Sequence, residues 1–93
     1  MNLDKAKKRI AKQVKKGFNG YPKITIAYYG TTKELATEVV IQFVLGEGDS
    51  AQEERFNCDT EIRDNELIQT TLLKIIERAN VNSVIEIEGV SIF

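Results

Sequence analysis

Two stretches of the chain alternate apolar and other side chains with a period of two, which is the spacing of a β-strand. Residues 24–29 place Ile24, Ile26 and Tyr28 on one face, and residues 39–45 repeat the pattern after a turn at 30–32. The two stretches therefore predict a β-hairpin with one apolar face that another layer must cover. The apolar members of the second stretch on that face are Val39, Ile41, Phe43 and Leu45.

The N-terminal segment has a helical period instead. Leu3, Ala6, Ile10 and Val14 fall within a stripe about 80° wide when residues are placed every 100°. The stripe predicts a helix that lies on a core and ends near residue 16, where Gly17 suits a left-handed terminating position. Most of the basic residues of this segment fall on the opposite, outward face, and only Lys7 sits at the edge of the stripe. The outward basic residues are Lys5, Lys8, Arg9, Lys12, Lys15 and Lys16.

This helix concentrates the positive charge of a nearly neutral chain. Residues 2–16 hold seven basic residues and one acid, a net charge of +6, so the rest of the chain carries −7 because the total is −1. A row of lysines can neutralise phosphates and release their counterions, which predicts an anion-binding or nucleic-acid-binding face. The alternative is a solvated outer face, since no aromatic residue lies among these cations to stack on a base.

The second half of the chain predicts three further elements. Residues 46–50 read as a loop, and residues 55–60 alternate as a polar strand at a sheet edge. Asp64 or Asn65 can cap a second helix that Asn80 ends, with a core face of about 100° and Leu67 and Leu73 at its flanks. Residues 83–93 are predicted to form the last strand, with a bulge at Gly89. The core-facing residues of the second helix are Ile68, Leu72, Ile75, Ile76 and Ala79.

These elements predict a single α+β domain over residues 1–93, because 93 residues hold one hydrophobic core. The order is α-β-β-β-α-β. Hairpin connections make the first three strands antiparallel, and a crossover through the second helix returns the last strand parallel to the first. We expect a mainly antiparallel four-stranded sheet of order 3-2-1-4 with two helices on one face.

The α-β-β-β-α part of this order resembles, in topology, the double-stranded-RNA-binding domain. In that family the second helix starts with a lysine-rich motif that grips phosphates. The matching stretch here, residues 64–71, holds two acids and no base. The resemblance therefore transfers no binding residue to this chain.

The composition argues against most catalytic chemistry. The chain has no His and one cysteine, Cys58, so Ser-His and Cys-His catalysis and a Cys/His zinc site lack their residues. Without a cation to lower its pKa, Cys58 reads as a half-buried structural thiol. No pair of carboxylates or tyrosines is marked out by spacing, so we expect a protein that is not an enzyme and uses no cofactor.

The same counts suggest a cytoplasmic protein. One thiol forms no intrachain disulfide, and the charged N-terminus lacks the apolar core of a signal peptide. The longest mostly apolar run, residues 39–45, is far shorter than the roughly 20 residues of a membrane-spanning helix. We therefore expect the reducing cytoplasm and no membrane partner.

An acidic cluster precedes the second helix. Asp59, Glu61, Asp64 and Glu66 could attract Mg²⁺ or Ca²⁺. Their spacing matches no metal loop, and helix capping explains two of the four. We predict no metal site here.

The leading functional hypothesis is an interaction module that self-associates through an open sheet face or an edge strand. Val40 and Val44 make the second face of their strand partly apolar, and Tyr29 must point opposite to Tyr28. Tyr29, Val40 and Val44 therefore predict an apolar-aromatic patch of the kind found at protein interfaces, or else an ordinary sheet surface. Pairing of the basic helix with the acidic body of a neighbour would add to association. We expect a homodimer or a protein partner, with nucleic-acid binding as the alternative.

Overall fold

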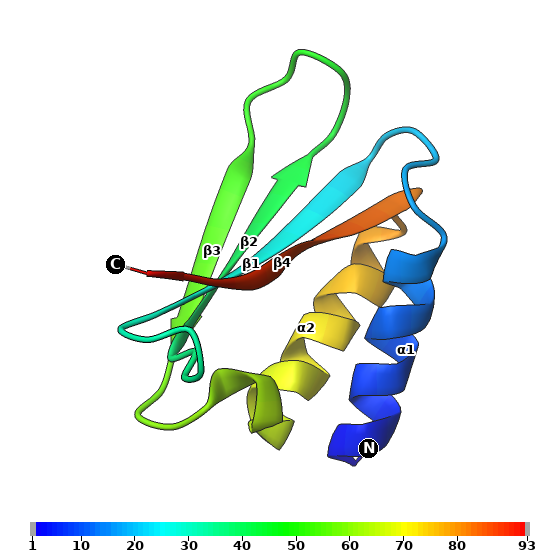
Figure 1. The fold of residues 1–93 in the computed structure, drawn as a ribbon. Helices are drawn as coiled ribbons and strands as arrows, with labels where there is room; N and C mark the ends of the chain where they lie inside the picture. The colour runs from blue at the N-terminus through cyan, green and yellow to red at the C-terminus, as the bar shows by residue number, and fades with distance from the viewer. Residues whose placement is uncertain (1, 93) are drawn as a thin grey trace.

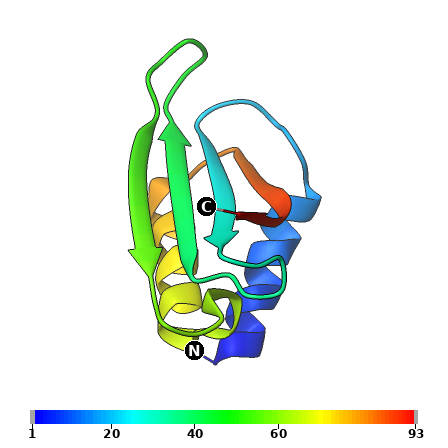
Figure 2. The same cartoon turned by 60° about the vertical axis from the view of Figure 1, so that its left-hand side comes forward.

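The protein has two layers, with a sheet on one side and two helices on the other. The computed structural model describes residues 2–92. Figure 1 shows both helices against one face of the sheet, and Figure 2 shows the opposite face, which no helix covers. The elements are α1 (Leu3–Lys15), β1 (Lys23–Gly30), β2 (Glu38–Val44), β3 (Gln52–Asn57), the 3-10 turn η1 (Ile62–Asp64), α2 (Glu66–Ala79) and β4 (Ser83–Ile92).

The strands lie in the order β3-β2-β1-β4, as the sequence predicts. β2 pairs antiparallel with both β1 and β3, whereas β4 pairs parallel with β1. The parallel pair follows from the long return through α2, since a parallel partner needs a crossover connection. The sheet is therefore mixed, with one parallel pair in a mainly antiparallel arrangement.

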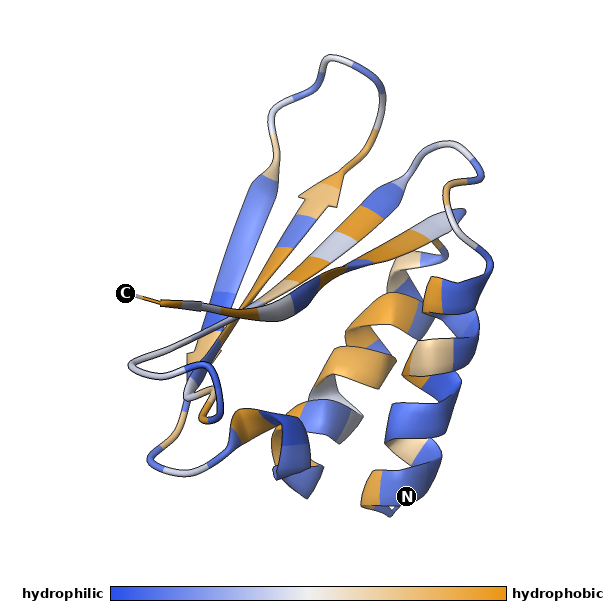
Figure 3. Ribbon diagram, in the orientation of Figure 1, coloured by the Kyte–Doolittle hydropathy of each residue, from blue (hydrophilic) through white to orange (hydrophobic). Residues whose placement is uncertain are grey.

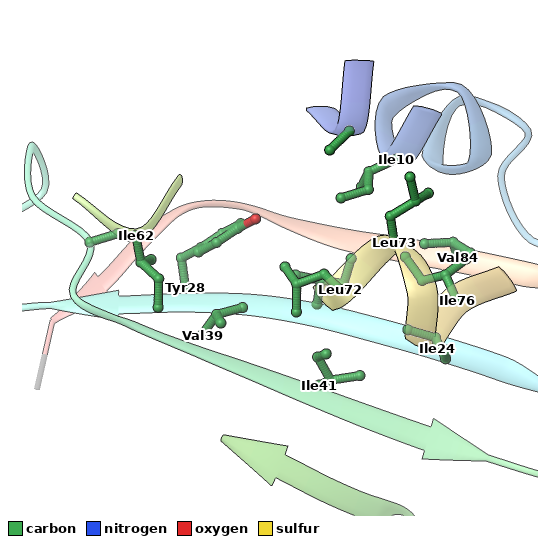
Figure 4. Packing of buried hydrophobic residues seen from close by; sticks show 13 residues of the cluster. Ile10, Ile24, Tyr28, Val39, Ile41, Ile62, Leu72, Leu73, Ile76 and Val84 are labelled. Atoms are coloured by element: carbon green, nitrogen blue, oxygen red, sulfur yellow. The ribbon is translucent and has the colours of Figure 1, made fainter. Parts of the chain in front are cut away.

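The core fills the space between the layers. Ile24, Ile26 and Tyr28 of β1 are buried in this core, as their alternation predicts. Tyr28 lies beside Ile62 at one end of the cluster (Figure 4). Leu45 does not join this row, because it lies past the end of β2 and is 65% exposed. The buried apolar side chains are Ala6, Ile10, Ile24, Ile26, Tyr28, Ala36, Val39, Ile41, Ile62, Leu72, Leu73, Ile76 and Val84.

Helix α1 begins and ends where its sequence predicts. The Asn2 side chain caps it by accepting a hydrogen bond from the Lys5 amide at 2.9 Å. Ala6 and Ile10 are buried against the core, while the outward face is hydrophilic (Figure 3). Gly17 follows the helix with φ of 70°, the left-handed conformation that glycine adopts without steric cost.

Helix α2 buries more of its surface. Asn65 caps it through a 3.0 Å bond from the Ile68 amide, and Asn80 ends it in the left-handed region. Leu67, expected at the flank of the core face, is 77% exposed, whereas the polar Gln69 is only 2% exposed. The Gln69 amide nitrogen donates hydrogen bonds to the Tyr28 hydroxyl at 3.3 Å and to a backbone carbonyl at 3.1 Å, so this buried polar group has hydrogen-bond partners.

The third strand differs from the prediction of residues 55–60. It spans Gln52–Asn57, so its pairing starts three residues earlier and stops before Asp59 and Thr60. An edge strand pairs through its backbone and does not need an apolar alternation, which is why the polar start was missed. At the other end, the Cys58 amide still donates to the Thr37 carbonyl at 2.9 Å, and the chain then turns to bury Ile62 of η1.

A cluster of polar bonds holds the 31–37 loop against η1. The Glu61 carboxylate accepts from the Ala36 amide at 3.1 Å, from the Arg63 amide at 3.0 Å, and from the Arg63 guanidinium at 2.6 and 2.8 Å. The Arg63 guanidinium beside it is the main reason that the pKa of Glu61 falls to about 2. We call Glu61, Arg63 and the Ala36 amide the Glu61 latch.

Candidate functional site

The uncovered face of the sheet has a centre in which apolar and polar side chains are mixed. Because side chains alternate along a strand, Thr25, Ala27 and Tyr29 of β1 point away from the helices. Ala27 pairs with Val40 of β2, and Thr25 with Gln42, so these side chains share one face. We call this surface, formed by the outward side chains of the four strands, the open sheet face.

The centre of the open sheet face is hollowed. The hollow has a volume of about 170 Å³. Small side chains on the central strand leave this space between the larger ones around it. The residues around the hollow are Thr25, Ala27, Tyr29, Val40, Gln42, Ile87 and Ser91.

The structure places the three predicted interface residues on this face but not all at its centre. Tyr29 and Val40 both line the hollow. Val44 lies at the end of β2, where it pairs with Lys23 rather than with a residue of the hollow. Val40 is only 4% exposed although no helix covers it, because its neighbours on the same face surround it. It acts as the floor of the hollow, and the side chains at the rim are what a partner would meet first.

The centre of the open sheet face is bordered on the β3 side by a polar network. The Arg55 guanidinium contacts Glu53 at 2.8 Å and Glu38 at 3.5 Å, and Gln42 donates to the second Glu53 oxygen at 3.1 Å. Hydrogen bonds from Gln42 and then Arg55 lower the pKa of Glu53, and the bond to Glu53 raises the pKa of Arg55. The charges beside the hollow thus already have partners within the sheet.

Ile87 of β4 is the main residue of this face that the sequence did not single out. Its side chain is 47% exposed and lines the hollow. The alternation of Ile85 and Ile87 with Glu86 and Glu88 was visible in the sequence. Which of the two sets faces the helices was not, because it depends on the pairing with β1, which puts Ile85 beside Thr25 and Glu86 beside Ile26.

The basic residues of α1 form a second candidate surface. All six predicted anion-binding residues are exposed. Arg9 reaches Glu77 of α2 at 3.9 Å, and Lys7, at the stripe edge, contacts Asp64 at 3.1 Å. The other five form no ion pair with any of residues 2–92. These unpaired cations are Lys5, Lys8, Lys12, Lys15 and Lys16.

Two of the four residues of the acidic cluster form structural contacts. Glu61 forms the Glu61 latch, and Asp64 pairs with Lys7. Among residues 2–92, no group of three or more carboxylate or thiol side chains is placed to hold a metal ion. Cys58 is half-buried, and its thiol donates to the Thr60 carbonyl at 3.1 Å.

Comparisons with known proteins add no relative. The chain matches no family model, and no curated protein or solved structure was found to be significantly similar to it. Within the described residues, no helix has the length and apolar character needed to cross a bilayer. The functional argument therefore depends on the two surfaces themselves.

Proposed function

We propose that the protein is an interaction module that forms a homodimer through the open sheet face. The observation that carries the proposal is the hollow, in which apolar and polar side chains are mixed, with Ile87 exposed at its rim. A two-fold symmetric contact brings the same patch of both copies together, so a patch that holds both a protruding side chain and a hollow can complement itself. The protruding Ile87 of each copy would enter the hollow of the other.

The neighbouring charges favour this contact over one with a charged partner. Arg55 is already paired with Glu53 and Glu38. An apolar surface that docks here therefore does not remove water from an unpaired charge of this network. Burying an unpaired charge would cost several kcal/mol. The face is therefore suited to an apolar partner surface, and the same face of a second copy of the protein is such a surface.

The size of the face predicts a weak dimer. Four strands about 4.8 Å apart and about seven residues long cover roughly 440 Å² per copy. A stable interface buries roughly 800 Å² per partner. We therefore expect a dimer that forms in the range of tens of micromolar or above and dissociates on dilution.

Sedimentation equilibrium between about 10 µM and 1 mM tests this proposal, because the range spans the expected dissociation constant. The average mass should rise with concentration from 10.5 kDa toward twice that value. The substitution Ile87→Asp should keep the protein monomeric, since it places a charge in the contact. The matched control Leu67→Asp changes a side chain that is 77% exposed on α2, away from the open sheet face, and should leave the dimer intact. A wild-type mass of 10.5 kDa at the highest concentration would disprove the proposal, as would equal loss of dimer in both variants.

The unpaired lysines of α1 support nucleic-acid binding as a second candidate. They recur about every helical turn along one exposed face, where each can neutralise a phosphate. With five such cations, the affinity for a duplex should fall with salt at a log-log slope of about −4. Fluorescence anisotropy with a labelled 20-base-pair duplex measures this slope.

Paired substitutions locate the contact on α1. The double variant Lys8→Gln/Lys12→Gln should reduce the slope by about two units, because each phosphate contact contributes about 0.9. The control Lys74→Gln removes an exposed lysine of α2 and should leave the slope unchanged. Absence of binding at low salt would remove this candidate.

A further inference from the structure

A cleft opens between α1, η1 and the middle of β4, on the side of the sheet that the helices cover. Its volume is about 370 Å³, which is within the range of small-molecule sites. It is separate from the hollow of the open sheet face, which lies on the other side of the sheet. The residues around the cleft are Lys7, Ile10, Ala11, Val14, Lys15, Tyr28, Arg63, Gln69 and Glu86.

The fold leaves this space for two reasons. The register of β4 shifts against β1 around Gly89, whose φ is 76°, and the strand curves away beyond this point (Figure 1). On the opposite side, α1 presents the short side chain of Ala11 between Ile10 and Val14. The wall formed by these three residues is apolar.

The floor of the cleft holds polar groups with unused bonding capacity. Tyr28 is 6% exposed and Gln69 is 2% exposed. The Tyr28 hydroxyl accepts a hydrogen bond from Gln69 at 3.3 Å but donates its own proton to no residue in the range 2–92. Burial raises the pKa of this hydroxyl, so it keeps the proton. A buried hydroxyl without an acceptor is an unfilled position for a ligand atom that accepts a hydrogen bond.

Cations predominate around these groups. Lys7 and Lys15 come from α1 and Arg63 from η1, against the single carboxylate of Glu86 on β4. Arg63 directs Nε and Nη2 toward Glu61, which leaves Nη1 without a partner among the described side chains. Lys15 also lacks an ion pair within the described chain. Lys7 is already paired with Asp64 at 3.1 Å and Arg63 with Glu61 at 2.6 Å, so the Lys15 ammonium and Nη1 of Arg63 are the cationic donors left for an anionic ligand.

The carboxyl group of Glu86 also lines the cleft. Much of its side chain remains accessible to solvent, yet desolvation of the carboxyl raises its pKa, against the opposing effects of Arg63 and Lys7. It forms no hydrogen bond or ion pair with any residue that the structure describes. The partly apolar walls thus weaken its hydration without providing it with a partner.

We propose that this cleft binds a small amphipathic carboxylate. The ligand's carboxylate would accept a hydrogen bond from the Tyr28 hydroxyl and lie near Arg63 and Lys15. Its alkyl chain would lie along the wall of Ile10, Ala11 and Val14. A cationic ligand fits less well, because an ammonium group cannot accept a hydrogen bond from the Tyr28 hydroxyl and would lie near Lys15 and Arg63.

Titration of the ¹⁵N-labelled protein with octanoate, followed by amide chemical shifts, tests this proposal. Saturable shifts should appear at Ala11, Gln69 and Glu86, with a dissociation constant of a few millimolar or tighter, as expected for a ligand of about ten heavy atoms. Hexylamine, which has a similar chain and the opposite charge, should produce no saturable shifts at these amides. Saturable binding of hexylamine instead of octanoate, or no saturable shifts with octanoate, would overturn the proposal.

Three substitutions assign the contacts. Ala11→Phe should fill the cleft and abolish binding, while the control Ala51→Phe, in the exposed loop before β3, should not. Tyr28→Phe should weaken binding about fivefold through loss of one hydrogen bond. Glu86→Gln should strengthen it about threefold or more by removing the repulsion. Unchanged affinity in Ala11→Phe, with a native circular dichroism spectrum, would place octanoate elsewhere, and weaker binding in Glu86→Gln would show that the charge preference is reversed.

Discussion

Replacing Glu61 with glutamine should destabilise the fold in a way that depends on pH. Both oxygens of Glu61 accept hydrogen bonds, one from the Ala36 amide and the Arg63 guanidinium and the other from the Arg63 amide and guanidinium. A glutamine keeps the shape but replaces one acceptor with a donor, so two N–H groups lose their partner. The Glu61 latch would then no longer hold the 31–37 loop against η1.

The magnitude follows from the pKa of Glu61. A decrease from 4.5 to about 2 corresponds to at most about 3.4 kcal/mol of stability when the carboxylate is charged. The Arg63 side chain is 36% exposed and that of Glu61 20%, so solvent screening reduces this value to about 1–2 kcal/mol. Because the folded pKa is lower than the unfolded one, this contribution is complete above about pH 5 and is lost as the pH falls from 4.5 toward about 2.

Urea unfolding followed by far-UV circular dichroism measures this effect. At pH 7 the Glu61→Gln variant should have a free energy of unfolding lower than the wild type by about 1–2 kcal/mol, and the difference should shrink by pH 2. The control Glu47→Gln changes an exposed loop carboxylate and should show little difference at either pH. A difference for Glu61→Gln that stays constant from pH 7 to pH 2 would refute the assignment of the stability to the charged carboxylate.

Substitutions at three further positions test the packing and the backbone conformation. Gly30→Ala should cost about 2 kcal/mol or more, because an added Cβ would overlap the backbone carbonyl of Leu35; urea midpoints should show the loss, and a wild-type midpoint would contradict the close approach. Leu72→Ala, at a fully buried position, should cost about 2–5 kcal/mol in the same assay. Asn80 has φ of 50°, so thermal melts should show Asn80→Gly close to wild type and Asn80→Ala less stable than that variant by about 1 kcal/mol.

Local patterns in the sequence determined the elements and most of their faces. The alternation of Ile24, Ile26 and Tyr28 predicts which side of β1 is buried, and the helical stripe through Ala6 and Ile10 predicts how α1 lies on the core. These patterns succeed because a strand and a helix each fix the direction of a side chain from its position in the chain. The order of the strands followed from the short hairpins and one long crossover.

Pairing between distant segments determined the features of the fold that local patterns do not predict. The start of β3 at Gln52 depends on backbone pairing with β2, which leaves no mark on its polar side chains. The exposure of Ile87 on the open sheet face depends on the register of β4 against β1.

The candidate sites show the same division. From the sequence came the exposed cations of α1 and the placement of Tyr29 and Val40 on the uncovered face, because periodicity assigns a side chain to a face. Only the tertiary structure produced the hollow around Val40 and the cleft that brings Tyr28 and Arg63 to α1. Both spaces depend on how far apart the packed elements stand. The sequence predicts the bulge at Gly89, but the separation also depends on how side-chain volumes from distant segments pack together, which no local pattern encodes.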